Sequence, residues 1–350
     1  MKTFLLTLEY LPFKGGVANY YSHLVKYWPS EMTVVTHHDL MKKKYLIPWL
    51  AAFFKLKNIL KKNPESLILI GQVLPLGTVA WLNYLIKPYK YVVIFHGMDF
   101  SFALKSSRKA YLMSKSLKYA NKIVCANSYV ADLIKKWRPE YESKIVIINP
   151  GVDDVATVAD PLLLEKYHNH NKVILLSLGR LVKRKGVDKV LEALALLDKE
   201  FNDKILYLIA GTGESEMYLK ELASKLKTEV IFTGEVSEPE KWALLDLCDI
   251  FIMPAREING DFEGFGIVYL EANLCGKPVI AGRSGGVSDA VNDGESGLLV
   301  NPESIQEISL AIKALVINQD ERERMGKIGR ERALESFKWQ TQITKLYNNL

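Results

Sequence analysis

The chain has 350 residues and a mass of 39.7 kDa, too large for one ordinary hydrophobic core, so two domains of about 150 residues or more are expected. Hydrophobic residues make up 49% of the sequence and charged residues 25%, as in ordinary globular proteins. Three widely spaced cysteines exclude a disulfide framework and a cysteine zinc site. No apolar run reaches the length of a membrane span, and Glu9 interrupts the apolar start, which predicts a strand and no signal peptide.

The two halves of the chain carry opposite net charge. Residues 1–150 contain 22 Lys and Arg against 8 Asp and Glu, a net charge of +14. Residues 151–350 contain 24 against 32, a net charge of −8. This asymmetry indicates that the first half faces an anionic partner, either nucleic acid or an anionic membrane surface.

The first half alternates short apolar runs with helical stretches. Short runs bounded by turn residues are typical of buried parallel strands. Such strands are expected at residues 3–8, 32–36, 67–70, 91–95, 122–126 and 145–148. Helices are expected at residues 17–28, 48–62, 76–86, 107–120 and 128–137.

The same alternation begins again in the second half. Strands are expected at residues 172–180, 204–211, 229–234, 249–254, 278–282 and 297–300, with helices after most of them. The fold class is therefore α/β, with two Rossmann-like domains whose parallel sheets face each other across a cleft. The expected boundaries are a first domain at 1–152, a linker at 153–171, a second domain at 172–335 and a C-terminal helix at 336–350 that packs back on the first domain.

Two features of the first half lie where ligands bind α/β sheets. Gly15 and Gly16 form a loop before a helix, whose free N–H groups favour an anion, although a tight turn is the simpler explanation. His96 directly follows the strand at 91–95, beside Gly97. A single histidine is more often structural, but the carboxyl end of a strand makes ligand contact equally plausible.

The sequence SLGRLVKRKG places four cations after the first strand of the second half. Arg180 ends the strand, and Lys183, Arg184 and Lys185 follow in a loop that precedes a helix. Such crowding is typical of a phosphate clamp, and a solvated basic loop is the alternative. We expect Arg180 and Lys185 to bind a diphosphate, and the other two to face solvent.

The sequence DFEGFGIVYLEA contains two carboxylates in an apolar setting. Glu263 lies in the loop before a helix, where Gly264 and Gly266 on either side of Phe265 allow a ligand to approach the backbone. Glu271 lies about two turns inside the helix, which its apolar neighbours predict to be buried. The two carboxylates are therefore expected to contact different parts of one elongated ligand and not to form a catalytic pair. A surface glutamate is the alternative for Glu271.

These segments together resemble a known enzyme family. Arg180 with Lys185, the E-x7-E spacing of EGFGIVYLEA, and GKPVIAGRSGGVSDAVNDGESGLLV are similar to the retaining group 1 nucleotide-sugar glycosyltransferases of GT-B fold, which include bacterial phosphatidylinositol mannosyltransferase-like enzymes. Residues 172–335 match best, and the first half matches through Gly15-Gly16, FHGMD and VCANSYVADLI. The pair Ser288-Asp289 departs from the Pro-Glu that the family often has there.

The resemblance implies a role for each matching residue. Arg180 and Lys185 would bind the donor diphosphate, Glu263 the transferred sugar, Glu271 the ribose, and His96 the sugar near its anomeric carbon. The implied catalytic residues are His96, Glu263, Arg180 and Lys185. The implied donor contacts are Gly15, Gly16, Arg180, Lys185, Gly234, Val236, Glu263, Gly264, Phe265, Gly266, Ile267 and Glu271. Asn127 and Ser128 are expected to contact the acceptor.

The expected reaction transfers a hexosyl unit, mannose or glucose, from a GDP- or UDP-sugar to a lipid-linked or glycan acceptor with retention. Cations and helix N-terminal amides would stabilise the leaving diphosphate. The sequence contains no Asp-x-Asp, so neither a metal nor a cofactor is expected. A nucleotide-sugar epimerase of the same architecture and a catalytically silent binder are the alternatives.

The basic first half offers a reason for membrane binding. Residues 40–63 contain seven lysines among aromatic and aliphatic residues, and residues 105–122 add six cations. A basic amphipathic helix can lie on an anionic membrane, although a sheet-covering helix with a solvated lysine face is the alternative. No nucleic-acid-binding motif is present, so nucleic acid is not expected as a partner. We expect a peripheral location on the cytoplasmic face of the membrane.

Overall fold

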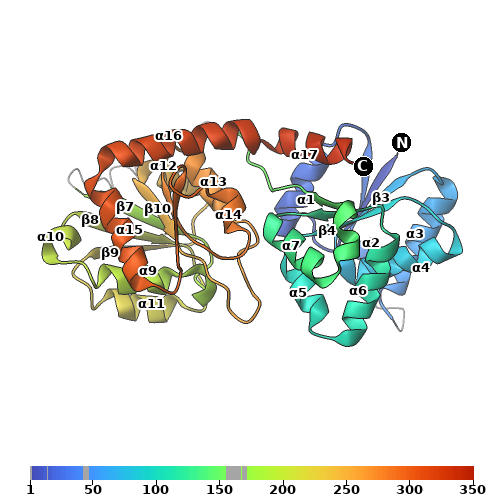
Figure 1. Cartoon of the computed structure of the whole chain (residues 1–350), viewed down its shortest axis with the longest axis horizontal. Coiled ribbons are helices and arrows are strands. Elements are labelled where there is room, and N and C mark those ends of the chain that lie inside the picture. Colours follow the sequence, from blue (N-terminus) through green and yellow to red (C-terminus); the bar gives the residue numbers. More distant parts are fainter. Residues whose placement is uncertain (1, 14, 42–46, 155–166, 168–171) are drawn as a thin grey trace. The chain divides into compact units, whose positions relative to one another are not determined.

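The computed structural model describes residues 2–13, 15–41, 47–154, 167 and 172–350. It divides into two compact units, Met1–Gly151 with Trp339–Leu350, and Val152–Lys338 (Figure 1). Each unit is built on one six-stranded parallel sheet with helices packed against it. The α/β class with two parallel sheets is therefore confirmed. Most of the expected linker, 153–171, lies outside the described residues.

The sheet of the first unit has the strand order β2-β1-β3-β4-β5-β6. Every pairing in it is parallel, and the strands are apolar because both faces are covered. The strands lie within two residues of the expected bounds: β1 (Thr3–Leu6), β2 (Met32–Val35), β3 (Leu67–Ile70), β4 (Tyr91–Phe95), β5 (Lys122–Cys125) and β6 (Ile145–Ile147).

The five helices expected in the first unit are present. They are α1 (Gly16–Lys26), α3 (Leu50–Lys62), α4 (Thr78–Ile86), α6 (Ser107–Tyr119) and α7 (Ser128–Trp137). The sequence did not predict two short helices, α2 (His37–Leu40) and α5 (Met98–Leu104). The C-terminal helix α17 (Trp339–Asn348) belongs to this unit, because Trp339 is only 2% exposed and its ring contacts Tyr20 and His23 of α1.

The sheet of the second unit has the strand order β12-β11-β10-β7-β8-β9. Its pairings are parallel as well, so the carboxyl ends of all six strands lie along one edge. The strands are β7 (Val173–Leu178), β8 (Ile205–Ala210), β9 (Glu229–Gly234), β10 (Ile250–Met253), β11 (Val279–Gly282) and β12 (Gly297–Val300).

Helices cover both faces of this second sheet. One buried core joins it to α12 (Glu238–Leu247), α13 (Ile267–Leu274), α14 (Val287–Ala290) and α16 (Gln319–Ser336), which Figure 1 shows together on one side. A second core joins it to α9 (Val187–Leu194), α11 (Glu216–Ala223) and α15 (Ile305–Ile317). A short helix, α10 (Lys199–Asn202), precedes β8. None of the described helices is long and apolar enough to cross a membrane.

Gly186 connects the basic loop after β7 to α9 at a position that only glycine fits. Its φ is +77°, and a Cβ at this position would overlap the carbonyl oxygen of Pro254 in the loop after β10. The two loops can therefore pack backbone against backbone. This contact fixes the cations at 183–185 against the end of the neighbouring strand.

Gly186→Ala should lower the free energy of unfolding of the second unit more than Gly294→Ala does. Gly294 has a φ of +76°, but a Cβ there would meet no described atom within 4 Å. Both changes cost about 1–2 kcal/mol of backbone strain, and only Gly186→Ala adds an overlap worth about 1–3 kcal/mol. Urea unfolding of the two variants measures the difference, and equal midpoints would show that the Pro254 contact does not constrain the loop.

Candidate functional site

The candidate site lies at the carboxyl edge of the second sheet, where two neighbouring strands end. β7 leads into the basic loop, whose residues Lys183–Lys185 form one short helical turn. β10, its parallel neighbour, leads into the loop that carries Glu263. Because parallel neighbours end at the same edge, loops 80 residues apart in sequence lie beside each other there.

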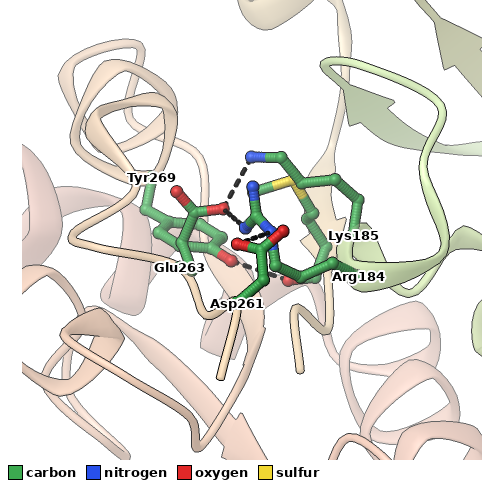
Figure 2. Close-up of polar contacts among 6 residues, drawn as sticks. Arg184, Lys185, Asp261, Glu263 and Tyr269 are labelled. Carbon is green, nitrogen blue, oxygen red and sulfur yellow. Dashed lines mark hydrogen bonds and ion pairs between the residues drawn. The ribbon is translucent and has the colours of Figure 1, made fainter. Parts of the chain in front are cut away.

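Glu263 is held by two cations from the basic loop. Its Oε2 accepts a hydrogen bond from Lys185 Nζ at 2.6 Å and from Arg184 Nη1 at 2.7 Å (Figure 2). The side chains of Glu263, Lys185 and Arg184 are only 13%, 14% and 11% exposed. Arg184 Nε also pairs with Asp261 Oδ1 at 3.1 Å. The cluster therefore combines charges of both signs in a largely water-excluded position.

The carboxylate of Glu263 stays ionised in this cluster. Burial by itself would raise the pKa of Glu263, but Lys185 and Arg184 outweigh burial and hold the pKa below its usual value. Burial acts to lower the pKa of Arg184, and Glu263 with Asp261 raises it overall. A carboxylate kept ionised by two cations is suited to accept hydrogen bonds from hydroxyl groups and is a poor proton acceptor.

Arg184 corrects one expectation from the sequence. It does not face solvent, because its guanidinium bridges Glu263 and Asp261 and is largely buried. Lys183 is exposed, as expected. No feature of the basic loop distinguishes the two residues in sequence, since the partners of Arg184 come from the loop after β10.

Arg180 lies at the end of β7 with a different environment. Its side chain is exposed, and within the described residues no ion pair or hydrogen bond engages it. The Lys185 side chain passes close to Gly179, the residue before Arg180. The exposed cation Arg180 and the half-buried cation Lys185 therefore lie close to each other after β7.

Close backbone packing fixes the position of Glu263. Its carbonyl oxygen accepts a hydrogen bond from the N–H of Gly286 at 3.0 Å, in the loop after β11. Gly285 has a φ of +59°, and a Cβ there would overlap that same carbonyl oxygen. The loop after β11 can therefore approach Glu263 only with glycine at position 285.

The segment 264–267 forms the start of α13. Phe265 is 4% exposed and packs into the core, so only its backbone is available to a ligand. Gly266 caps the helix with a φ of +80°, and a Cβ there would overlap the ring of Tyr269. The Tyr269 hydroxyl donates to the Met253 carbonyl at 2.8 Å, which ties α13 to the end of β10 (Figure 2). Gly264 and Ile267 are half-buried.

Glu271 has a separate cation partner. Its Oε1 accepts a hydrogen bond from Lys241 Nζ of α12 at 2.8 Å, and both side chains are 15% exposed. Lys241 also pairs with Glu238 at 2.6 Å. Burial raises the pKa of Glu271, and Lys241 opposes that rise. The expectation of a buried helix is confirmed, and Glu271 and Glu263 form no carboxylate pair.

The two residues expected to contact the base follow β9. Gly234 ends that strand with a φ of +77°, and its carbonyl accepts a hydrogen bond from Gly211 N at 2.7 Å. Val236 is half-buried and packs against the core. Both lie at the carboxyl edge of the sheet, and contact with a base stays a prediction.

In the first unit, the residues expected to contact the donor follow β1 and β4. Gly15, with a φ of +156°, precedes α1 and Gly16 is its first residue; both are exposed, and a Cβ at either would meet no described atom within 4 Å. His96 directly follows β4, and its Nε2 lies 2.8 Å from the Tyr21 hydroxyl. Burial lowers the pKa of His96 to about 4, so the imidazole is neutral at pH 7.

Asn127 lies at the N-terminus of α7, and its contact with an acceptor stays a prediction. Its side chain is fully buried and caps α7, with Oδ1 accepting a hydrogen bond from Val130 N at 2.8 Å. This is the usual role of an asparagine before a helix. Ser128 is half-buried at the first position of that helix, and its contact with an acceptor stays a prediction.

Sequence reasoning missed a buried ion pair beneath the site. Arg256 is 2% exposed, and its Nη2 lies 2.6 Å from Asp188 Oδ2 of α9. The backbone N–H of Arg256 donates to the carbonyl of Arg184 at 2.9 Å. Arg256 thus ties the loop after β10 to the basic loop at Arg184 and to the start of α9 at Asp188. Its only sequence signal is an arginine after the apolar run 250–253.

The arrangement suits recognition of an anion beside a polyhydroxyl group. Cations lie at one sheet edge with the ionised Glu263 next to them, and α13 begins shortly after Glu263 with its N-terminus at the same edge. Among the described residues, no group of three or more His, Cys, Asp or Glu side chains is arranged to hold a metal ion.

Two family models match the chain, and together they cover most of it. Residues 164–332 match the model for group 1 glycosyl transferases, and residues 14–155 match the model for glycosyltransferase family 4. The first match contains Arg180, Lys185, Glu263 and Glu271. The second contains His96.

Named relatives agree with these matches. A GDP-mannose-dependent alpha-(1-6)-phosphatidylinositol monomannoside mannosyltransferase from Mycolicibacterium smegmatis is 36% identical over 205 residues, which are 56% of this chain and 53% of that protein. The matched part thus spans about half the length of that relative. A GDP-mannose-dependent monoacylated alpha-(1-6)-phosphatidylinositol monomannoside mannosyltransferase from Corynebacterium glutamicum is 26% identical over 379 residues, which are 100% of this chain and 97% of that protein.

A solved structure confirms the fold. The crystal structure of a glycosyltransferase from Rickettsia africae superposes with a TM-score of 0.81 and 21% identity over 99% of this chain and 97% of that chain. At this identity the likeness speaks for the fold alone. The GT-B fold expected from the sequence is therefore confirmed.

Arg184→Gln should destabilise the second unit, whereas Lys183→Gln in the same loop should not. Removing Arg184 leaves Asp261 and Glu263 with fewer partners, a loss of about 1.5–3 kcal/mol for a hydrogen bond to a charged group, and an exposed lysine contributes close to nothing. The pKa of Glu263 is lowered in the folded protein, so its stabilising effect is present above its unfolded pKa and is lost as the pH falls through the folded pKa.

The difference between wild type and Arg184→Gln should therefore be largest near pH 7 and shrink below about pH 4. Urea unfolding at pH 7 and at pH 3.5 measures it. An equal effect of the two substitutions would contradict the buried role of Arg184.

Proposed function

We propose that this chain is a group 1 glycosyltransferase that transfers a hexosyl unit from a nucleotide-diphosphate sugar to a lipid-linked or glycan acceptor with retention. The observation that carries this proposal is the cluster in which Lys185 and Arg184 bind Glu263, next to the open cation Arg180. Such a site offers positive charge for a diphosphate and a carboxylate for sugar hydroxyls within one strand edge. Both are needed to hold a nucleotide sugar.

GDP-mannose is the donor that the relatives favour. The proteins from Mycolicibacterium smegmatis and Corynebacterium glutamicum are both named as GDP-mannose-dependent mannosyltransferases acting on phosphatidylinositol mannosides. We extend this to mannose transfer onto a glycolipid acceptor. The epimerase and the silent binder gain no support, since the relatives reported above are named as transferases.

The proposed chemistry is electrostatic. As the bond between the anomeric carbon and the diphosphate breaks, negative charge grows on the leaving oxygen, and Arg180 with Lys185 stabilises it. Lys185 can turn from Glu263 to the diphosphate because Arg184 remains with Glu263 as its counter-ion. Binding the donor then leaves no buried carboxylate unpaired, which would be costly.

Glu263 acts in this proposal as a hydrogen-bond acceptor for sugar hydroxyls. Its lowered pKa makes it a weak base, so it positions the sugar and does not take the acceptor's proton. Glu271 is proposed to bind the ribose, and the loop at Gly234 and Val236 the base. The roles of Gly15, Gly16 and His96 remain proposals of the same kind.

Two further parts of the proposal concern metals and membranes. We expect transfer without a metal ion, because cations of the protein are placed to neutralise the diphosphate. We also expect binding to anionic lipids through the first unit. In α3, Ala51, Ala52, Leu56 and Ile59 are buried, and the outer face carries exposed Phe54, Lys57, Lys61 and Lys62. Lys42, Lys43 and Lys44 lie outside the described residues.

A second basic and apolar surface lies on α5 and α6. Met98 and Phe102 are 55% exposed and Tyr111 is 56% exposed. The ammonium of Lys109 lies 3.5 Å from the centroid of the Phe102 ring, and Arg108 is exposed beside it. Residues 100–131 contain no Asp or Glu. Exposed aromatic residues among unopposed cations are suited to an anionic membrane surface.

Glu263→Ala should reduce mannose transfer from GDP-mannose at least about tenfold, because one charge-assisted hydrogen bond to the sugar is worth about 1.5–3 kcal/mol. The exposed Glu331→Ala on α16 is the matched control and should leave transfer unchanged. Transfer to a mannolipid acceptor is measured both without and with EDTA.

Near-wild-type activity of Glu263→Ala would contradict its assignment, and loss of activity in EDTA that added Mg²⁺ restores would overturn metal independence. A thermal-shift screen of GDP-mannose against UDP-glucose tests the donor, because a ligand that binds only the folded state raises the melting temperature.

Replacing Lys57, Lys61 and Lys62 together by Gln should weaken sedimentation with vesicles rich in anionic lipid at least about tenfold, since each cation near such a surface contributes about 1 kcal/mol. A charge-matched control replaces Lys204, Lys220 and Lys225 of the second unit, which are also exposed. Equal sedimentation of the two triple variants would contradict a membrane role for α3.

A further inference from the structure

A chain of hydrogen bonds runs from His96 into the sheet of the first unit. His96 Nε2 lies 2.8 Å from the Tyr21 hydroxyl oxygen, and that hydroxyl donates to the carbonyl oxygen of Gly71 at 2.5 Å. Tyr21 lies on α1 and Gly71 directly follows β3. Three separate elements thus meet at one buried hydroxyl group.

The donors and acceptors in this series of hydrogen bonds determine which ring nitrogen of His96 carries the proton. A carbonyl oxygen can only accept, so the single hydroxyl proton of Tyr21 must point to Gly71. The Tyr21 oxygen is then left as an acceptor, and His96 Nε2 must carry the proton. The other ring nitrogen, Nδ1, is bare and has no hydrogen-bond partner among the described residues.

The ionisation states of both groups agree with this order. Burial raises the pKa of Tyr21 well above its usual value, so its hydroxyl keeps the proton. Burial lowers the pKa of His96 to about 4, so the ring holds only one proton at neutral pH. The nearby Asp99 carboxylate accepts from the backbone N–H groups of His96, Gly97 and Phe100, and no hydrogen bond joins it to the imidazole.

The His96 ring also contacts a second tyrosine, Tyr20, that does not take part in these hydrogen bonds. The Tyr20 ring packs edge-on to the His96 ring, with 4.9 Å between centroids, and the Tyr21 ring does so at 5.1 Å. The buried Tyr20 hydroxyl has no hydrogen-bond partner among the described residues. Adjacent tyrosines therefore share the packing role, and only Tyr21 controls the proton.

We propose that Tyr21 is a positioning residue that holds His96 in the Nε2–H tautomer, so that bare Nδ1 accepts a hydrogen bond from a hydroxyl of the transferred sugar. This inference rests on the proposed function for its last step, and its first step concerns the free protein alone. A neutral acceptor is suited to a sugar hydroxyl, and it adds no positive charge near a carbon that becomes electron-poor. Because α1 starts at Gly16, the helix that carries Tyr21 also begins at the Gly15-Gly16 loop.

The first test determines the tautomer directly. In protein carrying ¹⁵N-labelled histidine, protonated and bare ring nitrogens have well-separated shifts, and His96→Gln identifies the signals of His96 among the six histidines. The expected result at pH 7 is a proton on Nε2 and a bare Nδ1 in the wild type. A proton on Nδ1 would overturn the proposal, and this measurement needs neither a variant at Tyr21 nor any activity.

The matched variants Tyr21→Phe and Tyr20→Phe separate the hydroxyl from the ring. In Tyr21→Phe an Nε2–H would face a phenyl ring without an acceptor, so the proton should move to Nδ1. Tyr20→Phe should leave the tautomer as in the wild type. An unchanged tautomer in folded Tyr21→Phe would contradict control by the hydroxyl.

The last test asks whether Tyr21 acts through His96. Tyr21→Phe should lower kcat/KM for transfer about tenfold, as the loss of one hydrogen bond does, and Tyr20→Phe less than about twofold. In a His96→Ala background, Tyr21→Phe should have no further effect. Additive losses would contradict a positioning role. If no transfer is detected with the wild type, the proposed function fails while the tautomer result still stands or falls by itself.

Discussion

The carboxylate of Glu263 is the group on which the candidate site of the second unit depends. Its Oε2 accepts from both Lys185 and Arg184, which reach it from a loop almost eighty residues earlier. A largely buried carboxylate without cations would be costly, and two adjacent buried cations without a carboxylate would repel each other. Each charge therefore offsets the free-energy cost of burying the others. With Arg180 open beside them, the cluster keeps an excess of positive charge where we propose the diphosphate to bind.

This cluster depends in turn on how closely three backbone loops approach one another. Gly186 lets the basic loop lie against Pro254, and Gly285 lets the loop after β11 lie against the carbonyl of Glu263. Arg256 adds a buried ion pair with Asp188 and a backbone hydrogen bond to Arg184. The polar groups are therefore preorganised by glycines and by a buried charge pair, which lowers the cost of orienting them when a ligand binds.

The first unit uses its charges differently. Its many lysines lie mainly on outer helix faces such as that of α3, while the residue expected at the sugar, His96, is neutral and held by buried tyrosines. The net positive charge of residues 1–150 thus lies mainly on the surface of the first unit. The surroundings of His96 are instead determined by hydrogen bonds. A charge count from sequence cannot separate these two layers, because it contains no information about burial.

The sequence by itself determined the α/β class, the strand positions to within two residues, and which loops carry the candidate site. It could do so because short apolar runs, glycines and cations follow local periodicity and local turn chemistry. Only the tertiary structure decided that Arg184 is largely buried while Lys183 is exposed, that Asn127 is a helix cap, and that Arg256 forms a buried ion pair with Asp188. The physical reason is that a side chain's charge state and burial depend on partners from loops far away in sequence, which parallel strand pairing brings to one edge of the sheet.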